Sequence, residues 1–268
     1  MKLYASHLFV LFFSLLFVNL VHANEAVVNL HLARPSIGDT PNNRYMHELL
    51  SLAFAQQNKK VNFLYTVEPM NKKRIVEELQ KPNSINLAWL SIPQGSQPTL
   101  RHTSLALYQG LHGKRLLIIN KNQQSRFAEI STVEQLKPLI ALQKQSWSDY
   151  DVLIRNGFTV NGELSYAGMT KALETGLADH FPRSVSAITA EMSKLQHQNL
   201  MIEPSIMLQY SNPYHFYTHK QNDEMLKQLE AGLLKIQQNG QFELLYNRYF
   251  ADKERQLQLA TRKIFVLQ

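Results

Sequence analysis

The sequence predicts an α/β protein, and three observations support this. Short apolar runs alternate with longer segments whose apolar residues recur at helical spacing, the pattern of strands layered with helices. No internal repeat or low-complexity linker interrupts the alternation. The 268 residues are enough for one two-lobed protein or for two smaller sequential domains.

The first half of the alternation is read from residue periodicity. Strands are predicted at 27–33 and 61–67, and helices at 44–57 and 71–79. A short buried strand at 85–90 should then lead into a loop at 91–99.

The second half begins with an apolar run, Leu116–Ile119, typical of a strand buried on both faces. Ser131 to Glu134 matches a capping box, which predicts a helical turn at 132–136. The other predicted strands are 139–142, 178–181 and 214–218. Further helices are predicted at 146–156, 166–175 and 186–196. A long helix should run from 223 to a stop at Asn239-Gly240, and a short aromatic helix should begin at 241.

The first 23 residues have the features of a secretory signal peptide. Lys2 precedes an apolar run at 8–20, and Val21-His22-Ala23 places small residues at the −3 and −1 positions of a cleavage site. No second run of about 20 apolar residues follows. We therefore expect a soluble, monomeric periplasmic protein of 245 residues starting at Asn24, with an uncleaved N-terminal anchor as the alternative.

The composition and charge of the chain limit which covalent links and binding partners we expect. The chain has no cysteine, so we expect neither a disulfide nor an N-terminal lipid, and the protein should not be a lipoprotein. The formal charge is +7, or +6 after removal of Lys2. The basic residues are scattered, so we do not expect binding to nucleic acid or to a membrane surface. A diffuse positive charge is compatible with attraction of small anions.

Signals for an enzyme are weak. No P-loop or dinucleotide fingerprint occurs. His215 and His219 would lie roughly 13 Å apart on a strand, which is awkward for binding one metal ion. Ser146 to Asp149 places a serine near an acid, but no base can be assigned to it. We therefore expect no catalytic residue, no metal and no cofactor.

Four segments carry a resemblance to a known family. They are the C-terminal helix, Asn-Gly stop and aromatic helix at 223–250, and the stretches STVEQLKPLIALQKQSWSDYDVLIRNG, SYAGMTKALETGLADHFPRS and YSNPYHFYTHK. Their order and character resemble bacterial solute-binding proteins of family 3, the amino-acid receptor type. A more particular likeness is to a subgroup with a YQGL-type crossing and an FPRS segment.

The resemblance implies a type II periplasmic-binding fold, in which two lobes are joined by two extended crossings. The crossings would be Gln109–Lys114 and Gln209–Pro213. Lobe 1 would comprise 24–109 and 214–268, and lobe 2 about 115–208. Two sequential α/β domains are the alternative.

The family's chemistry is recognition of a ligand rather than bond-making. An arginine in lobe 1 clamps the ligand carboxylate with paired hydrogen bonds, and an acid in lobe 2 binds its ammonium group. Arg101, five residues after Ser96, has the spacing of that arginine. Ser146 and Trp147 fall where the family places ligand-facing backbone amides. Trp89 ends a predicted strand, where open α/β sheets bind ligands, although a core tryptophan fits equally well.

Two departures from the family concern charge. Ser184, preceded by Arg183, stands where the family has its ammonium-binding acid, and Arg34 stands where a carboxylate is common. A ligand ammonium group facing Arg183 would be repelled, because two unit like charges about 4 Å apart repel by about 4 kcal/mol at an effective dielectric constant near 20. We therefore expect an anionic ligand in a cleft lined by Arg34, Trp89, Ser96, Arg101, Ser146, Trp147, Arg183 and Ser184. The alternative is that Arg183 pairs with Glu163 or Glu191.

The resemblance thus implies a periplasmic protein that closes on a small carboxylate or amino-acid-like ligand and delivers it to an ABC importer. One alternative is a ligand-sensing partner of a membrane receptor, which would also work by hinge closure. Another is a module that no longer closes on a small molecule. A dehydratase-like enzyme on the same fold is less consistent with the sequence, because arginines replace the acids expected in the cleft.

Overall fold

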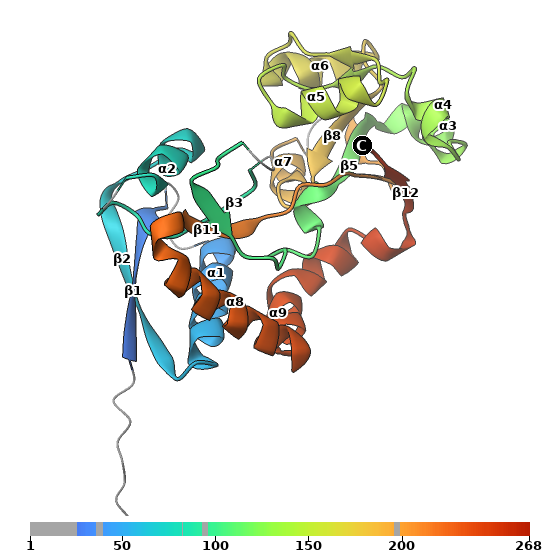
Figure 1. The fold of residues 1–268 in the computed structure, drawn as a ribbon. Helices are drawn as coiled ribbons and strands as arrows, with labels where there is room; N and C mark the ends of the chain where they lie inside the picture. The colour runs from blue at the N-terminus through green and yellow to red at the C-terminus, as the bar shows by residue number, and fades with distance from the viewer. Residues whose placement is uncertain (1–25, 36–39, 82, 93–95, 196–198) are drawn as a thin grey trace, which may run out of the picture.

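The computed structural model describes residues 26–35, 40–81, 83–92, 96–195 and 199–268. The expected signal peptide, its cleavage site and Asn24 lie outside the described residues. Within these ranges no helix is long and apolar enough to cross a membrane. The elements gather into two lobes, one around α1 and α8 and the other around α5 and α6 (Figure 1).

In the part of the chain that the structure describes, the first lobe combines two small sheets with four α-helices. Among the described residues, β1 pairs with β2 in parallel, and β11 pairs with β3 and β4 in antiparallel. The strands are β1 (Ala26–Arg34), β2 (Lys59–Pro69), β3 (Ala88–Leu90), β4 (Leu100–His102) and β11 (His215–His219). The helices are α1 (Pro41–Ala55), α2 (Lys72–Leu79), α8 (Asp223–Gln238) and α9 (Gln241–Gln256).

Helix α1 is the centre of this lobe. Thr40 caps it by accepting a hydrogen bond from the Asn43 amide, and Pro41 occupies its first turn. Its buried face packs against α8 at Gly232, where an added Cβ atom would lie 2.1 Å from the Ala53 carbonyl oxygen. The absence of a side chain at Gly232 therefore sets how closely the two helices approach.

The second lobe contains a mixed sheet, seven-stranded among the described residues, with strand order β12-β10-β5-β8-β6-β7 and with β9 also paired to β5. Its strands are β5 (Lys114–Asn120), β6 (Ala141–Leu142), β7 (Val160–Asn161), β8 (His180–Ser184), β9 (Leu200–Ile202), β10 (Ile206–Gln209) and β12 (Lys263–Val266). Its helices are α3 (Gln124–Ala128), α4 (Val133–Leu136), α5 (Ser148–Arg155), α6 (Tyr166–Thr175) and α7 (Ile188–Lys194). Central β5 contains the fully buried run Leu116–Ile119, as the sequence predicted.

Two crossings connect the lobes. The first follows β4, passes through Gln109 and Gly110, both with positive φ, and enters β5. The second leaves β10 and enters β11. A hydrogen bond of 3.1 Å from the Tyr210 amide to the Gly113 carbonyl joins them. A Cβ atom on Gly113 would lie 2.0 Å from the Tyr210 carbonyl oxygen, so the crossings can touch only because residue 113 is glycine.

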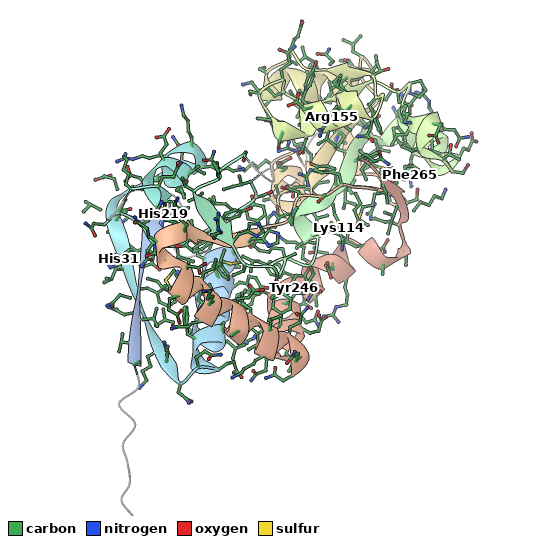
Figure 2. The ribbon with its side chains drawn as sticks, in the orientation of Figure 1. His31, Lys114, Arg155, His219, Tyr246 and Phe265 are labelled. Carbon is green, nitrogen blue, oxygen red and sulfur yellow. The ribbon has the colours of Figure 1, made fainter. Side chains whose placement is uncertain are left out.

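A third link, not anticipated from the sequence, runs from α9 to β12. Tyr246 of α9 lies in the first lobe, whereas Phe265 of β12 lies beside the second (Figure 2). Strand β12 pairs in parallel with β10, and the buried Arg262 guanidinium donates hydrogen bonds to the carbonyls of Leu257 and Ile206. The expected lobe boundaries remain a proposal, but this pairing adds the end of the return segment 214–268 to the second-lobe sheet.

Local boundaries differ from the sequence prediction in two instructive places. The capping box of α4 uses Thr132 and Gln135, one residue later than the expected Ser131 and Glu134. Strand β8 starts at His180 instead of residue 178, and directly before it the Asp179 carboxylate accepts a hydrogen bond from the Ile140 amide.

Candidate functional site

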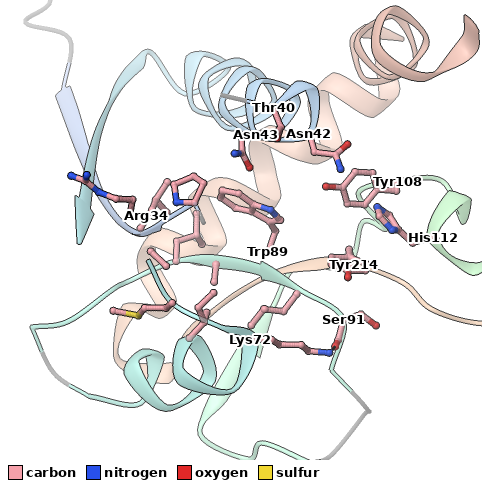
Figure 3. Close-up of a pocket in the computed structure, with 18 residues that line it drawn as sticks. Arg34, Thr40, Asn42, Asn43, Lys72, Trp89, Ser91, Tyr108, His112 and Tyr214 are labelled. Carbon is pink, nitrogen blue, oxygen red and sulfur yellow. Dashed lines mark hydrogen bonds between the residues drawn. The ribbon is translucent and has the colours of Figure 1, made fainter. Parts of the chain in front are cut away.

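A cavity of about 500 Å³ lies between the first lobe and the hinge (Figure 3). We call it the hinge cavity. Its volume falls in the range of small-molecule sites. It is lined by the end of β1 (Leu32 to Pro35), the start of α1 (Thr40, Asn42, Asn43), Met70, Lys72 and Ile75, the segment Leu87 to Ser91, and the hinge residues Tyr108, His112 and Tyr214.

Aromatic rings form one wall of this cavity. The ring centroids of Tyr108 and His112 lie 4.1 Å apart, those of His112 and Tyr214 4.6 Å, and those of Tyr108 and Tyr214 5.5 Å. Figure 3 shows these three rings on one side of the centrally placed Trp89. Tyr108 contacts the other two rings edge-to-face, a favourable geometry for aromatic pairs.

His112 is a neutral imidazole at pH 7. Burial, followed by the nearby charges of Arg115 and Lys253, lowers its pKa to about 4. Its backbone carbonyl accepts hydrogen bonds from Arg115 Nη1 at 2.8 Å and from Asn212 Nδ2 at 3.2 Å. The backbone at His112 is therefore held by Arg115 at the start of β5 and by Asn212 of the second crossing.

The phenols of Tyr108 and Tyr214 also stay neutral. Burial raises the pKa of each, and the neighbouring Tyr214 adds to the effect on Tyr108. The cavity wall at the hinge thus offers two hydroxyl groups and one uncharged imidazole.

The charged residues of the hinge cavity are cationic. Arg34 donates from Nε to the Thr66 carbonyl at 3.1 Å, and its guanidinium points away from Trp89 (Figure 3). Lys72 Nζ donates to the Ser91 carbonyl at 2.6 Å. None of the described residues that line the cavity is an acid.

A second pocket, of about 380 Å³, lies on the second lobe at the start of α5 and the end of β8. Four residues predicted from the sequence gather here: Ser146, Trp147, Arg183 and Ser184. Ser184 Oγ lies 2.8 Å from Ser186 Oγ.

Arg183 is not a free cation in this pocket. Its Nε lies 2.6 Å from Glu191 Oε2, and its Nη2 lies 2.5 Å from Glu191 Oε1. The guanidinium carbon also lies 4.8 Å from the centroid of the Trp147 ring and 4.7 Å from that of Phe181. Of the two alternatives raised by the sequence, the pairing with Glu191 is the one observed.

Arg101 and Ser96 line neither pocket. Arg101 lies on β4 opposite Thr218, and its Nη1 donates to the carbonyls of Pro98 and Leu100 at 3.1 Å. Ser96 is exposed. The structure therefore brings Arg34 together with Trp89, and the four second-lobe residues together, but it does not join Arg101 or Ser96 to either group.

The arrangement shows no metal site among the residues it describes, where no group of three or more potential ligands occurs. His215 Nδ1 lies 3.1 Å from the Leu105 carbonyl, and His219 Nδ1 accepts a hydrogen bond from the Gln221 amide. The two histidines are thus engaged with the backbone at opposite ends of β11.

No protein-family model and no curated protein matches the chain. Solved structures do match. One is the probable amino-acid ABC transporter extracellular-binding protein ytmK from Bacillus subtilis, with a TM-score of 0.58 at 13% identity over 84% of this chain and 99% of that one. Another is substrate-binding domain 2 of Lactococcus lactis GlnP in an open conformation, with a TM-score of 0.55 at 16% identity over 84% and 96%.

An ancestral arginine-binding protein bound to arginine matches with a TM-score of 0.52 at 14% identity over 84% of this chain and 98% of that one. Identities this low show the fold alone. The chain has a type II periplasmic-binding fold, with two lobes joined by a two-crossing hinge, as its family 3 resemblance implied. Membership of the subgroup with the YQGL and FPRS segments stays a prediction.

Proposed function

We propose that the protein is a solute-binding protein that captures a small molecule in the hinge cavity and closes its lobes over it. The observation that carries this proposal is that both crossings line the cavity, the first through Tyr108 and His112 and the second through Tyr214. A ligand there contacts the segments that must change when the lobes move, so it can favour one lobe arrangement over another.

We further propose that the ligand is anionic, a carboxylate or an amino-acid-like compound. Lys72 and Arg34 line the cavity, and an ammonium group would find no carboxylate among the described lining residues. Because Arg183 is compensated by Glu191, this argument rests on the first-lobe cations instead of on three converging arginines.

The second-lobe pocket is the surface we propose to meet the ligand on closure. Trp147 provides a ring, and Ser146 and Ser184 provide hydroxyl groups. For Arg101 and Ser96 a ligand role is supported by the family resemblance only.

The experiment is a thermal-shift screen of the purified protein lacking residues 1–23, followed by small-angle scattering with each stabilising compound. A bound ligand raises the melting temperature through RT ln(1 + [L]/Kd). We expect carboxylates to stabilise the protein and to contract it. Lys72→Met should weaken binding, while Lys73→Met, a neighbour on α2 that does not line the cavity, should not.

Two outcomes would contradict parts of the proposal. Saturable binding of neutral or cationic amino acids, undiminished in Lys72→Met, would contradict the proposal that the ligand is anionic. Binding without contraction would remove lobe closure. Arg101→Ala tests the family resemblance separately, because it should abolish binding only if that arginine reaches the ligand.

The cellular role we propose is periplasmic delivery of the ligand to an ABC importer, without catalysis. The family 3 resemblance and the solved binding proteins of the same fold support this role. Mass spectrometry of the mature species, expected to start at Asn24, tests the compartment. Uptake of the identified ligand by cells lacking this gene tests delivery, since an importer receptor predicts lost uptake whereas a sensor predicts lost signalling alone.

A further inference from the structure

Three polar side chains from the two crossings meet on one wall of the hinge cavity. Tyr108 and His112 precede β5, and Tyr214 precedes β11, a separation of about one hundred residues. A backbone hydrogen bond of 2.9 Å from the Leu107 amide to the Tyr214 carbonyl holds these distant segments together. The grouping is therefore a product of the hinge and not of either lobe alone.

The polar atoms of this wall are unused by the protein. In the described part of the chain, the hydroxyls of Tyr108 and Tyr214 and the ring nitrogens of His112 have no hydrogen-bond partner. Nor are they among the fully buried polar atoms without a partner, and all three residues line the cavity. Tyr45, in the same aromatic cluster, differs because its hydroxyl donates to the Leu107 carbonyl at 2.7 Å.

These groups match the needs of a carboxylate. Each phenol can donate one hydrogen bond and a neutral imidazole can donate one, while a carboxylate can accept about four. Hydrogen bonds to an ionised acceptor are roughly twice as strong as those between neutral groups. Arg101, the residue with the spacing of the family's arginine clamp, does not line this cavity, and its Nη1 donates to the carbonyls of Pro98 and Leu100.

We propose that a ligand carboxylate binds at the hinge itself, with Tyr108, His112 and Tyr214 as its hydrogen-bond donors in place of an arginine clamp. This inference rests on the proposed ligand-binding function and names the group by which the cavity recognises its ligand. Trp89, at the centre of the cavity in Figure 3, then faces the body of the ligand. A flat aromatic carboxylate is the class that uses both features.

The hinge position has a mechanical consequence. A carboxylate held by donors from both crossings adds a contact between segments that already touch at Leu107 and Tyr214 and at Gly113 and Tyr210. Any rearrangement of the crossings changes the spacing of the three donors. Affinity for the carboxylate and the angle between the lobes are therefore coupled.

Benzoate is the probe for this site, with benzamide as its uncharged analogue of the same shape. Titration of protein labelled with ¹⁵N-histidine should shift the His112 ring signals saturably with benzoate and far less with benzamide. Tyr108→Phe and Tyr214→Phe each remove one hydroxyl and should each weaken benzoate binding about tenfold or more. Tyr166→Phe, on α6 away from the cavity, is the matched control and should bind benzoate normally.

Unchanged His112 signals up to the solubility limit of benzoate would overturn the proposal. So would equal binding of benzamide, or wild-type affinity in both phenylalanine variants. Scattering separates this result from the proposed function. If carboxylates close the lobes equally well in the phenylalanine variants, the binding function stands and the hinge site is discarded. If benzoate binds through the hinge without lobe closure, the site stands and closure is discarded.

Discussion

Arg115 forms a two-point ion pair with Asp149 and thereby ties the start of β5, directly after the first crossing, to the N-terminus of α5. Arg115 Nε lies 2.7 Å from Asp149 Oδ2, and Nη2 lies 3.0 Å from Oδ1. The Tyr210 hydroxyl, from the second crossing, donates to the same carboxylate. Only 7% of the Arg115 side chain and 15% of the Asp149 side chain are exposed, so the pair is largely shielded from water.

We expect removal of one partner of this pair to be costly. Asp149→Ala leaves the Arg115 charge buried and uncompensated, which typically destabilises a protein by about 3–5 kcal/mol. Urea denaturation measures the loss. Asp223→Ala breaks an exposed pair with Lys227 on α8 and should cost less than about 1 kcal/mol. Equal losses in the two variants would show that the Arg115 pair adds nothing to stability.

The same pair should contribute to acid sensitivity. Burial opposes the charge of Asp149, but hydrogen bonding and charge attraction from Arg115, then hydrogen bonding from Tyr210, outweigh burial and lower the pKa of Asp149. A lowered folded-state pKa contributes stability that is present above the unfolded value of about 4 and is lost as pH falls further. The free energy of unfolding of Asp149→Asn should therefore fall less steeply below that pH than that of the wild type. Parallel curves would contradict this assignment.

Helices and strands could be predicted from the sequence where short local patterns, such as caps and apolar runs, define them. Helix α6 matches its predicted range, 166–175, because Ser165 caps its start and Gly176, at φ 74°, ends it. Strand β5 was found from the run Leu116–Ile119. Strands β10 and β12, each four residues long, were not assigned from the sequence, and their parallel pairing belongs to the third link between the lobes.

The candidate site was harder to predict from the sequence, because it depends on contacts between residues of different elements. The charge of Arg183 is cancelled by Glu191, eight residues later, a contact that depends on how β8 meets α7. Tyr108 lies next to the predicted first crossing, His112 within it, and Tyr214 just beyond the second. Their meeting required the backbone pairing of Leu107 with Tyr214. Aromatic and histidine residues at hinge segments were the signal that could have identified this wall.

His180 should destabilise the fold, so that its replacement by an apolar residue raises stability. Its side chain is fully buried, both ring nitrogens lack a partner, and the rings of Phe127 and Phe158 lie nearby. A buried polar group without a partner costs about 1–3 kcal/mol. We expect His180→Phe or His180→Leu to raise the melting temperature, whichever fits the space better. A lower melting temperature in both would mean that the imidazole is satisfied in solution.

His180 also predicts a pH effect of defined sign. Burial lowers its pKa to about 4, below the unfolded value of about 6.5. The unfolded chain then binds more protons between these two values, so stability should fall as pH drops from about 6.5 toward 4. Urea denaturation of His180→Leu across this range should give a shallower slope. Substitution of His31 by Leu is the matched control, because this histidine is exposed in β1.

Gly113 should not tolerate a side chain. In Gly113→Ala the Cβ atom would lie 2.0 Å from the Tyr210 carbonyl oxygen, so the two crossings would have to separate. We expect a loss of several kcal/mol or an altered hinge, since overpacking alone typically costs about 1–3 kcal/mol. Gly168→Ala is the matched control on α6, where the nearest atom would be 3.4 Å away and alanine favours the helix by up to about 1 kcal/mol. In urea denaturation we expect Gly113→Ala to lower the free energy of unfolding and Gly168→Ala to raise it. Equal changes in the two variants would contradict the close contact at Gly113.

The link from α9 to β12 should restrict the motion of the lobes. Helix α9 packs on α1 in the first lobe, while β12 is held in the second by its ladder with β10 and by hydrogen bonds between Asn156 and Gln268. Opening or closing at the two crossings must therefore also deform residues 257–262. We expect deletion of 263–268 to broaden the distribution of lobe separations in the ligand-free protein.

The chain has no cysteine, so Lys171→Cys on α6 and Lys227→Cys on α8 provide two specific sites for spin labels. Both side chains are about 70% exposed, and each belongs to a different lobe. Electron–electron distance measurements should show a wider distribution after the deletion, and a smaller change in Asn156→Ala, which releases only the terminal residue. Circular dichroism must show that the truncated protein keeps its fold, because loss of buried Phe265 and Leu267 removes about 1.5–3 kcal/mol each. An unchanged distribution in a folded truncated protein would show that the two crossings alone define the hinge.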